Sequence, residues 1–160
     1  MRQVVHDSPI PPSLSAESVS HVRSGLSPAE AWDHFAGKTE VRDRLWPLQR
    51  GLCAYCEARL VKEGCHIEHI RRKALHPEET FHWQNLVLNC QHRDSCGHFK
   101  DRDRERRPAV SDDLRFIKPT EADCHRYFFY LRNGDMVPSP ALGSEADRER
   151  AHYSIEVLGL

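Results

Sequence analysis

The chain has 160 residues, a formal net charge of −1 and a hydrophobic fraction of 39%, values that suit one small domain with a modest core. The near-neutral charge excludes a polycation, so any affinity for nucleic acid must come from locally clustered basic residues or from a partner. No apolar run approaches the roughly 20 residues of a membrane span, and residues 1–7 lack the apolar stretch of a signal peptide. These features predict a cytoplasmic protein.

Residues 1–23 include Pro9, Pro11 and Pro12, and this composition predicts an extended N-terminal arm. Apolar side chains in the arm, such as Val4, have two expected fates. They dock on another protein, since proline lowers the cost of ordering an extended segment, or they pack against the C-terminal helix of the same chain.

Residues 24–51 are expected to form a helical lead-in. The motif Ser-Pro-Ala-Glu at residues 27–30 is a capping box with proline at the first helical position, and it begins a short helix. A second helix follows, in which apolar residues recur near helical spacing until Gly51 ends it. We expect this second helix to pack on the cysteine-rich segment that follows.

Residues 52–108 contain four of the six cysteines at spacings that suit a metal site. Cys53 and Cys56 form a C-x-x-C turn, and Cys90 and Cys96 form a second pair. The cytosol keeps thiols reduced, which favours metal ligands over disulfides. Four thiolates make a tetrahedral structural Zn²⁺ site, and the two remaining cysteines are expected to be buried thiols.

Several polar residues between and just beyond the cysteine pairs suit catalytic and metal-binding roles. His69 is a candidate general base, because a neutral imidazole can take a proton from water. Glu68 offers the hard oxygen donors that Mg²⁺ or Mn²⁺ prefers. His98 is a candidate second ligand of that metal. His66 is the best substitute because it shares a strand face with Glu68, and Asp101 is a weaker one.

The order of these residues resembles that of the HNH, or ββα-metal, nucleases. It runs from an acidic residue and a histidine to Asn85 and then a further histidine, arranged around two cysteine pairs. The resemblance implies a mainly helical α+β protein in which residues 52–108 form a zinc-stabilised ββα-metal module. It implies an endonuclease that hydrolyses phosphodiester bonds with Mg²⁺ or Mn²⁺. It also implies that Glu68 and His69 address one site and that Asn85 orients the loop of the general base. The chain departs from the pattern at Gly97, which separates the last cysteine from the metal histidine.

Two basic stretches flank this cluster. Arg71, Arg72 and Lys73 directly follow the candidate base, and Lys100 begins a second stretch that extends to residue 107. Such side chains can bind phosphates without reading sequence. Acidic residues alternate with the basic ones in the second stretch, which is also typical of a solvated helix face.

Residues 109–160 are expected to form a hairpin and a helix that pack on the module. The aromatic-rich residues 126–131 precede Asn133 and Gly134, a pair that favours a type I′ turn between two strands. Ser144 is the expected N-cap of the last helix.

A narrower resemblance covers nearly the whole chain, since its motifs are similar to those of the HNH nuclease subunit of the Septu and retron-associated anti-phage systems. The motifs are Cys-Ala-Tyr-Cys-Glu at 53–57, His-Ile-Glu-His-Ile-Arg at 66–71, Trp-Gln-Asn-Leu at 83–86 and Cys-Gly-His-Phe-Lys-Asp at 96–101. The proline-rich start and the final Ile-Glu-Val-Leu-Gly-Leu at 155–160 are similar too, which extends the likeness to both ends. The resemblance implies an ABC-type ATPase partner and a role as the effector of antiviral defence. Two alternatives stay open at the level of sequence: a non-catalytic zinc-ribbon module that binds nucleic acid or protein, and a nuclease directed at RNA, for instance transfer RNA, rather than DNA.

Overall fold

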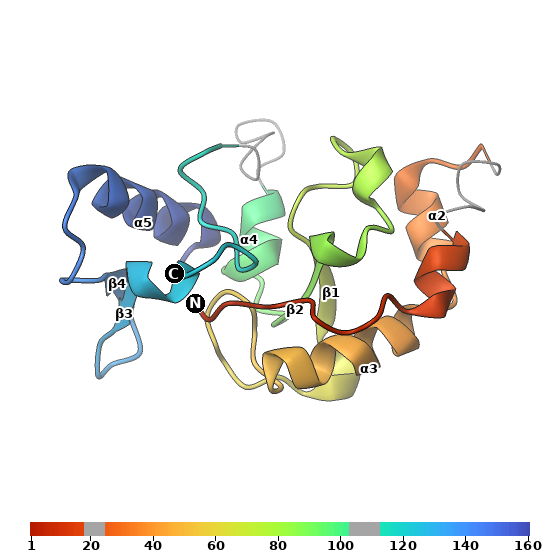
Figure 1. The fold of residues 1–160 in the computed structure, drawn as a ribbon, viewed down its shortest axis with the longest axis horizontal. Helices are drawn as coiled ribbons and strands as arrows, with labels where there is room; N and C mark the ends of the chain where they lie inside the picture. Colours follow the sequence, from red (N-terminus) through yellow and green to blue (C-terminus); the bar gives the residue numbers. More distant parts are fainter. Residues whose placement is uncertain (18–24, 103–112) are drawn as a thin grey trace.

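The computed structural model describes residues 1–17, 25–102 and 113–160, and it combines helices with two small antiparallel sheets (Figure 1). The expectation of an α+β protein is confirmed at this level. The helices and strands are α2 (Pro28–His34), α3 (Lys38–Gln49), β1 (His66–His69), β2 (Leu86–Asn89), α4 (Cys96–Arg102), β3 (Phe128–Tyr130), β4 (Met136–Pro138) and α5 (Glu145–Leu158). Short 3₁₀ turns are η1 (Lys62–Gly64), η2 (Pro77–Glu79), η3 (Trp83–Asn85) and η5 (Cys124–Tyr127).

Strands β1 and β2 lie in the middle of the molecule, with α2 toward one end and α5 toward the other (Figure 1). The two strands pair antiparallel, with Glu68 opposite Val87 and His69 opposite Leu86. The outer edge of β2 is closed by a side chain of α3. The buried Gln49 amide donates to the Leu88 carbonyl at 2.8 Å and accepts from the Leu88 N–H at 2.6 Å. The Gln49 amide thus takes the place of the backbone N–H and C=O groups that a third strand would offer to Leu88.

The capping box expected at the start of the lead-in is present. Ser27 Oγ accepts from the Glu30 N–H, and the Glu30 carboxylate accepts from the Ser27 N–H at 2.9 Å. Helix α3 ends where Arg50 and Gly51 take positive φ angles of 52° and 67°, which is the left-handed conformation common at helix C-termini.

The N-terminal arm is helical in part rather than extended throughout, and Val4 meets the second of its two expected fates, packing against the chain's own C-terminal helix. Residues 12–17 are helical, and the side chains of Val4 and Leu14 are 4% and 0% exposed. The Val4 N–H donates to the Pro119 carbonyl at 2.8 Å. Val4 packs in one hydrophobic cluster with Val157 of α5. Val4 and Leu14 are therefore buried apolar residues of the arm that stabilise the chain's own fold.

The C-terminal residues form the expected hairpin and helix, but the turn has a different geometry. Only Gly134 has a positive φ, 95°, whereas a type I′ turn needs positive φ at Asn133 as well. The Gly134 N–H donates to the Leu131 carbonyl at 3.0 Å, so the loop is longer than two residues. Ser144 caps α5 as expected. None of the described helices has the length and apolar character needed to cross a membrane.

Replacing Gln49 tests the link between α3 and the central strands. Gln49→Ala leaves the buried Leu88 N–H without its acceptor, so we expect the free energy of unfolding to fall by about 1–3 kcal/mol. Urea unfolding followed by circular dichroism measures the change. The exposed Gln84 provides the control, because Gln84→Ala removes the same groups from the surface. Equal midpoints for the two variants would show that Gln49 does not support β2.

Candidate active site and metal centres

The four cysteines expected to bind metal come together from three segments. Cys53 and Cys56 lie just after α3, Cys90 follows β2, and Cys96 begins α4. Their sulfur atoms all lie within 4.8 Å of one another. The Cys53 and Cys96 sulfurs are 3.8 Å apart, and those of Cys56 and Cys90 are 3.9 Å apart. Thiolates about 2.3 Å from a tetrahedral zinc ion are about 3.8 Å from each other, so the cluster fits one Zn²⁺.

The two other cysteines lie apart from this cluster, as the sequence predicts. Cys65 and Cys124 are 4% and 0% exposed. Their sulfurs donate to the backbone carbonyls of Lys62 and Pro119. Each is therefore a buried thiol with a structural role.

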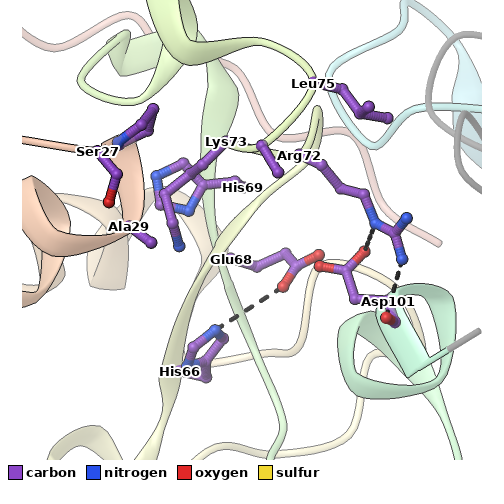
Figure 2. Close-up of a pocket in the computed structure, with 11 residues that line it drawn as sticks. Ser27, Ala29, His66, Glu68, His69, Arg72, Lys73, Leu75 and Asp101 are labelled. Atoms are coloured by element: carbon purple, nitrogen blue, oxygen red, sulfur yellow. Dashed lines mark hydrogen bonds and ion pairs between the residues drawn. The ribbon is translucent and has the colours of Figure 1, made fainter. Parts of the chain in front are cut away.

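A pocket of about 420 Å³ lies beside β1 (Figure 2). Its walls come from the end of β1, the loop that follows it, the start of α2 and the last turn of α4. Its lining residues are Ser27, Pro28, Ala29, His66, Glu68, His69, Arg72, Lys73, Ala74, Leu75 and Asp101. Glu68 and His69 thus open on the same pocket, although they are neighbours on a strand. His69 is the last residue of β1, where strict alternation ends.

His66 and Glu68 are two candidate ligands of the second, catalytic metal ion. Figure 2 shows the Glu68 carboxylate between His66 and Asp101. His66 Nε2 lies 3.9 Å from Glu68 Oε2, so the two candidate ligands face each other on one side of β1. The ring of His98, on α4, has its centroid 5.5 Å from that of His66. Asp101 is held instead by Lys100 and Arg72 at 2.8 and 2.9 Å.

The Glu68 carboxylate is buried and paired with Lys100. Glu68 is 3% exposed, and its Oε1 lies 3.0 Å from Lys100 Nζ. Burial raises the pKa of Glu68, and the Lys100 ammonium opposes that rise. Burial also lowers the pKa of Lys100, but the Glu68 and Asp101 carboxylates outweigh it and raise this pKa above its usual value. With 3.0 Å between the carboxylate oxygen and the ammonium nitrogen, the two residues form a buried ion pair.

Gly97 explains how α4 approaches β1 so closely. A Cβ atom at this position would overlap the Glu68 carboxylate and the Asn89 amide. The Asn89 amide is fully paired when its oxygen accepts from the Gly97 N–H at 3.1 Å and its nitrogen donates to the Cys90 carbonyl at 2.9 Å. The glycine that departs from the family pattern is therefore required by the packing of this chain.

His69 is held in one orientation by its backbone contact. The residue is 5% exposed, and its Nε2 lies 2.9 Å from the Thr80 carbonyl. A carbonyl only accepts, so Nε2 carries the proton and Nδ1 carries the lone pair. Burial and the nearby Lys73 ammonium lower the pKa of His69 to about 3. The ring is thus neutral at physiological pH, with a basic nitrogen on Nδ1.

Asn85 fastens the loop that follows β1. Its Oδ1 accepts from the Arg71 N–H at 2.7 Å, and its Nδ2 donates to the carbonyls of Arg71 at 3.0 Å and Glu79 at 3.1 Å. The side chain is 3% exposed. Both ends of the loop are thereby fixed to one amide, as the resemblance implies.

The basic residues expected to bind nucleic acid are not equivalent. The expectation that Lys100 binds nucleic acid is corrected by its burial. Its side chain is 2% exposed and paired with Glu68, so it cannot reach a phosphate at the surface. Arg71 pairs with Glu79 and lies outside the pocket, while Arg72 and Lys73 line it. Burial lowers the pKa of Lys73. The second basic stretch continues into residues 103–107, which lie outside the described residues.

Some site residues carried no sequence signal. Trp32 contacts the His69 ring from α2, and Thr80 supplies its carbonyl. A tryptophan in an amphipathic helix looks like an ordinary core residue, and a backbone acceptor is independent of side-chain identity. Their position beside His69 is set by the tertiary structure.

Removing one cysteine tests the zinc cluster. Zinc binding supplies on the order of 10 kcal/mol to small domains, so Cys56→Ser should lose the metal and fold poorly. Inductively coupled plasma mass spectrometry should give one zinc per parental chain. Cys65→Ser, which alters a thiol away from the cluster, should keep both metal and fold. Parental protein that folds normally with far less than one zinc per chain would contradict the zinc site.

Comparison with known proteins gives one informative relative. The chain is 28% identical over 137 residues to the protein named "Retron Vc95 putative HNH endonuclease" of Vibrio cholerae serotype O1 biovar El Tor. The match covers 81% of this chain and 62% of the relative's length. No family model matches the chain. The chain is therefore similar, over about three fifths of the relative's length, to a protein named as an HNH endonuclease of a retron.

Proposed function

We propose that this chain is a divalent-metal-dependent HNH endonuclease that hydrolyses phosphodiester bonds in nucleic acid. The observation that carries the proposal is the pairing, in one pocket, of a neutral imidazole with Nδ1 as its basic nitrogen and a buried carboxylate. Strands β1 and β2 followed by α4 have the element order that a ββα-metal module requires. The relative's name supports the same activity.

In this mechanism His69 is the general base. Nδ1 takes the proton from the attacking water, and the Thr80 carbonyl stabilises the imidazolium by accepting from Nε2. The low pKa keeps the base unprotonated until substrate binds. A phosphate entering the pocket adds negative charge, which raises the pKa of His69 toward the pH of the cell and strengthens the base.

Glu68, His66 and His98 would hold the catalytic Mg²⁺ or Mn²⁺. A bound divalent cation supplies positive charge that stabilises the phosphate and the leaving oxygen. The four cysteines set the start of α4 and therefore the position of His98, while Lys100 holds the second oxygen of Glu68. Asn85 maintains the loop that carries Arg72 and Lys73, the two basic side chains at the pocket.

The proposal extends to antiviral defence, in which the chain acts as an effector with an ABC-type ATPase. The retron context of the relative and the resemblance to Septu nuclease subunits support this role. Net charge near zero also suits a nuclease whose partner helps to capture substrate. Cleavage assays therefore include the protein with and without the ATPase, on both DNA and RNA.

Replacing the base separates an enzyme from a binding module. His69→Gln keeps an amide N–H for Thr80 but removes the basic nitrogen, so the cleavage rate should fall about 10²-fold or more while zinc content stays unchanged. Rates are measured on labelled DNA and RNA with Mg²⁺ or Mn²⁺. The control is His152→Ala, a change at an exposed histidine of α5. Cleavage by His69→Gln at the parental rate would exclude His69 as the base.

Metal titration tests the ligands of the catalytic ion. His66→Ala and His98→Ala should each raise the Mn²⁺ concentration for half-maximal cleavage by about tenfold or more, since even indirect support of a metal site is worth this much. His66 is substantially exposed, so its loss should leave stability unchanged. The control is again His152→Ala. An unchanged Mn²⁺ dependence in either variant would remove that histidine from the site.

A further inference from the structure

Trp32 is the side chain from the lead-in that contacts the proposed base. Its ring centroid lies 4.5 Å from that of His69, with an angle of 82° between the planes. Trp32 belongs to α2, whereas His69 ends β1, so the contact joins two separate parts of the chain. Trp32 is 5% exposed, so its indole ring is buried among other side chains.

The position of Trp32 is fixed by an aromatic cluster. Phe35 and Phe81 have ring centroids 5.4 and 5.8 Å from that of Trp32, and 5.5 Å from each other. Phe81 directly follows Thr80, whose carbonyl accepts from His69. One cluster therefore fixes both the indole beside the imidazole and the backbone that holds Nε2.

A single hydrogen bond does not determine where the basic nitrogen points. Cβ tethers one side of the imidazole and the bond to Thr80 holds Nε2, so the ring can still rock about the line between these two points. A rigid surface against the ring removes this freedom, and edge-to-face aromatic contacts have a preferred geometry. Lys73, which also lines the pocket, has its Nζ 5.9 Å from the Trp32 ring centroid.

We propose that Trp32 is a positioning residue for the reaction: it holds the His69 ring so that Nδ1 faces the attacking water. The inference rests on the proposed nuclease function. It makes the helical lead-in a part of the active site, because α2 supplies the surface that the β1–β2–α4 unit lacks around its base.

The kinetic test compares two losses of buried aromatic volume, one beside the base and one away from it. Trp32→Leu should lower kcat about tenfold or more with KM within about twofold, because a misplaced base slows chemistry without weakening substrate binding. Trp32→Phe should restore most of the rate, since it keeps an aromatic wall. Phe116→Leu is the matched control, because Phe116 is equally buried but packs in the hydrophobic cluster around Val4 and Val157, and its kcat should stay within about threefold of the parental value. If Trp32→Leu does not fold, Trp32→Met carries the same comparison.

A spectroscopic test needs no cleavage and so separates this inference from the proposed function. In protein with ¹⁵N-labelled histidine, His69 should show one tautomer with a protected Nε2–H. In Trp32→Leu the proton should stay on Nε2, because Thr80 still accepts from it, but the ring signals should shift and the Nε2–H should exchange faster with solvent, whereas Phe116→Leu and Trp32→Phe should keep the parental signals. A parental His69 signal and a parental kcat in Trp32→Leu would overturn the inference. Loss of activity in Phe116→Leu equal to that in Trp32→Leu would also overturn it, because the effect would then be one of general packing.

Discussion

The buried pair between Glu68 and Lys100 is the interaction on which the arrangement of the centre depends. A carboxylate that is 3% exposed needs a cation beside it, because removing one member of a buried ion pair costs about 3–5 kcal/mol. That requirement brings α4 onto β1, and only a glycine at position 97 permits the approach. The same contact sets where Asp101 lies at the pocket and where His98 lies beside His66.

The pocket is preorganised by parts that lie far apart in the sequence. His69 is fixed through the Thr80 carbonyl, the loop after it through Asn85, and Glu68 through Lys100. Each of these supports is itself buried, so the polar groups that face the pocket move little when charge develops near them. The result is an imidazole and a carboxylate, adjacent in the chain, that are held by independent contacts.

The segments outside the central unit also have defined tasks. The lead-in closes the edge of β2 through Gln49 and covers the proposed base through Trp32. At the opposite end, α5 packs against α4, with Gly159 so close to Asp94 and Phe99 that a Cβ atom there would lie 2.8 Å from the Asp94 carbonyl. In the described part of the arm, residues 1–17, Val5 and Ile10 are the large apolar side chains that face solvent, at 53% and 49% exposure.

The sequence by itself determined the features that depend on local spacing. Two cysteine pairs, a capping box at Ser27 and the alternation that puts His66 and Glu68 on one strand face follow from residue order, because turns, helix ends and strands have fixed periods. It could not show that Lys100 turns inward, that Leu14 is buried, or that Trp32 meets His69. Those outcomes depend on which surfaces meet after the chain folds, since burial and long-range charge pairing are set by neighbours distant in the sequence.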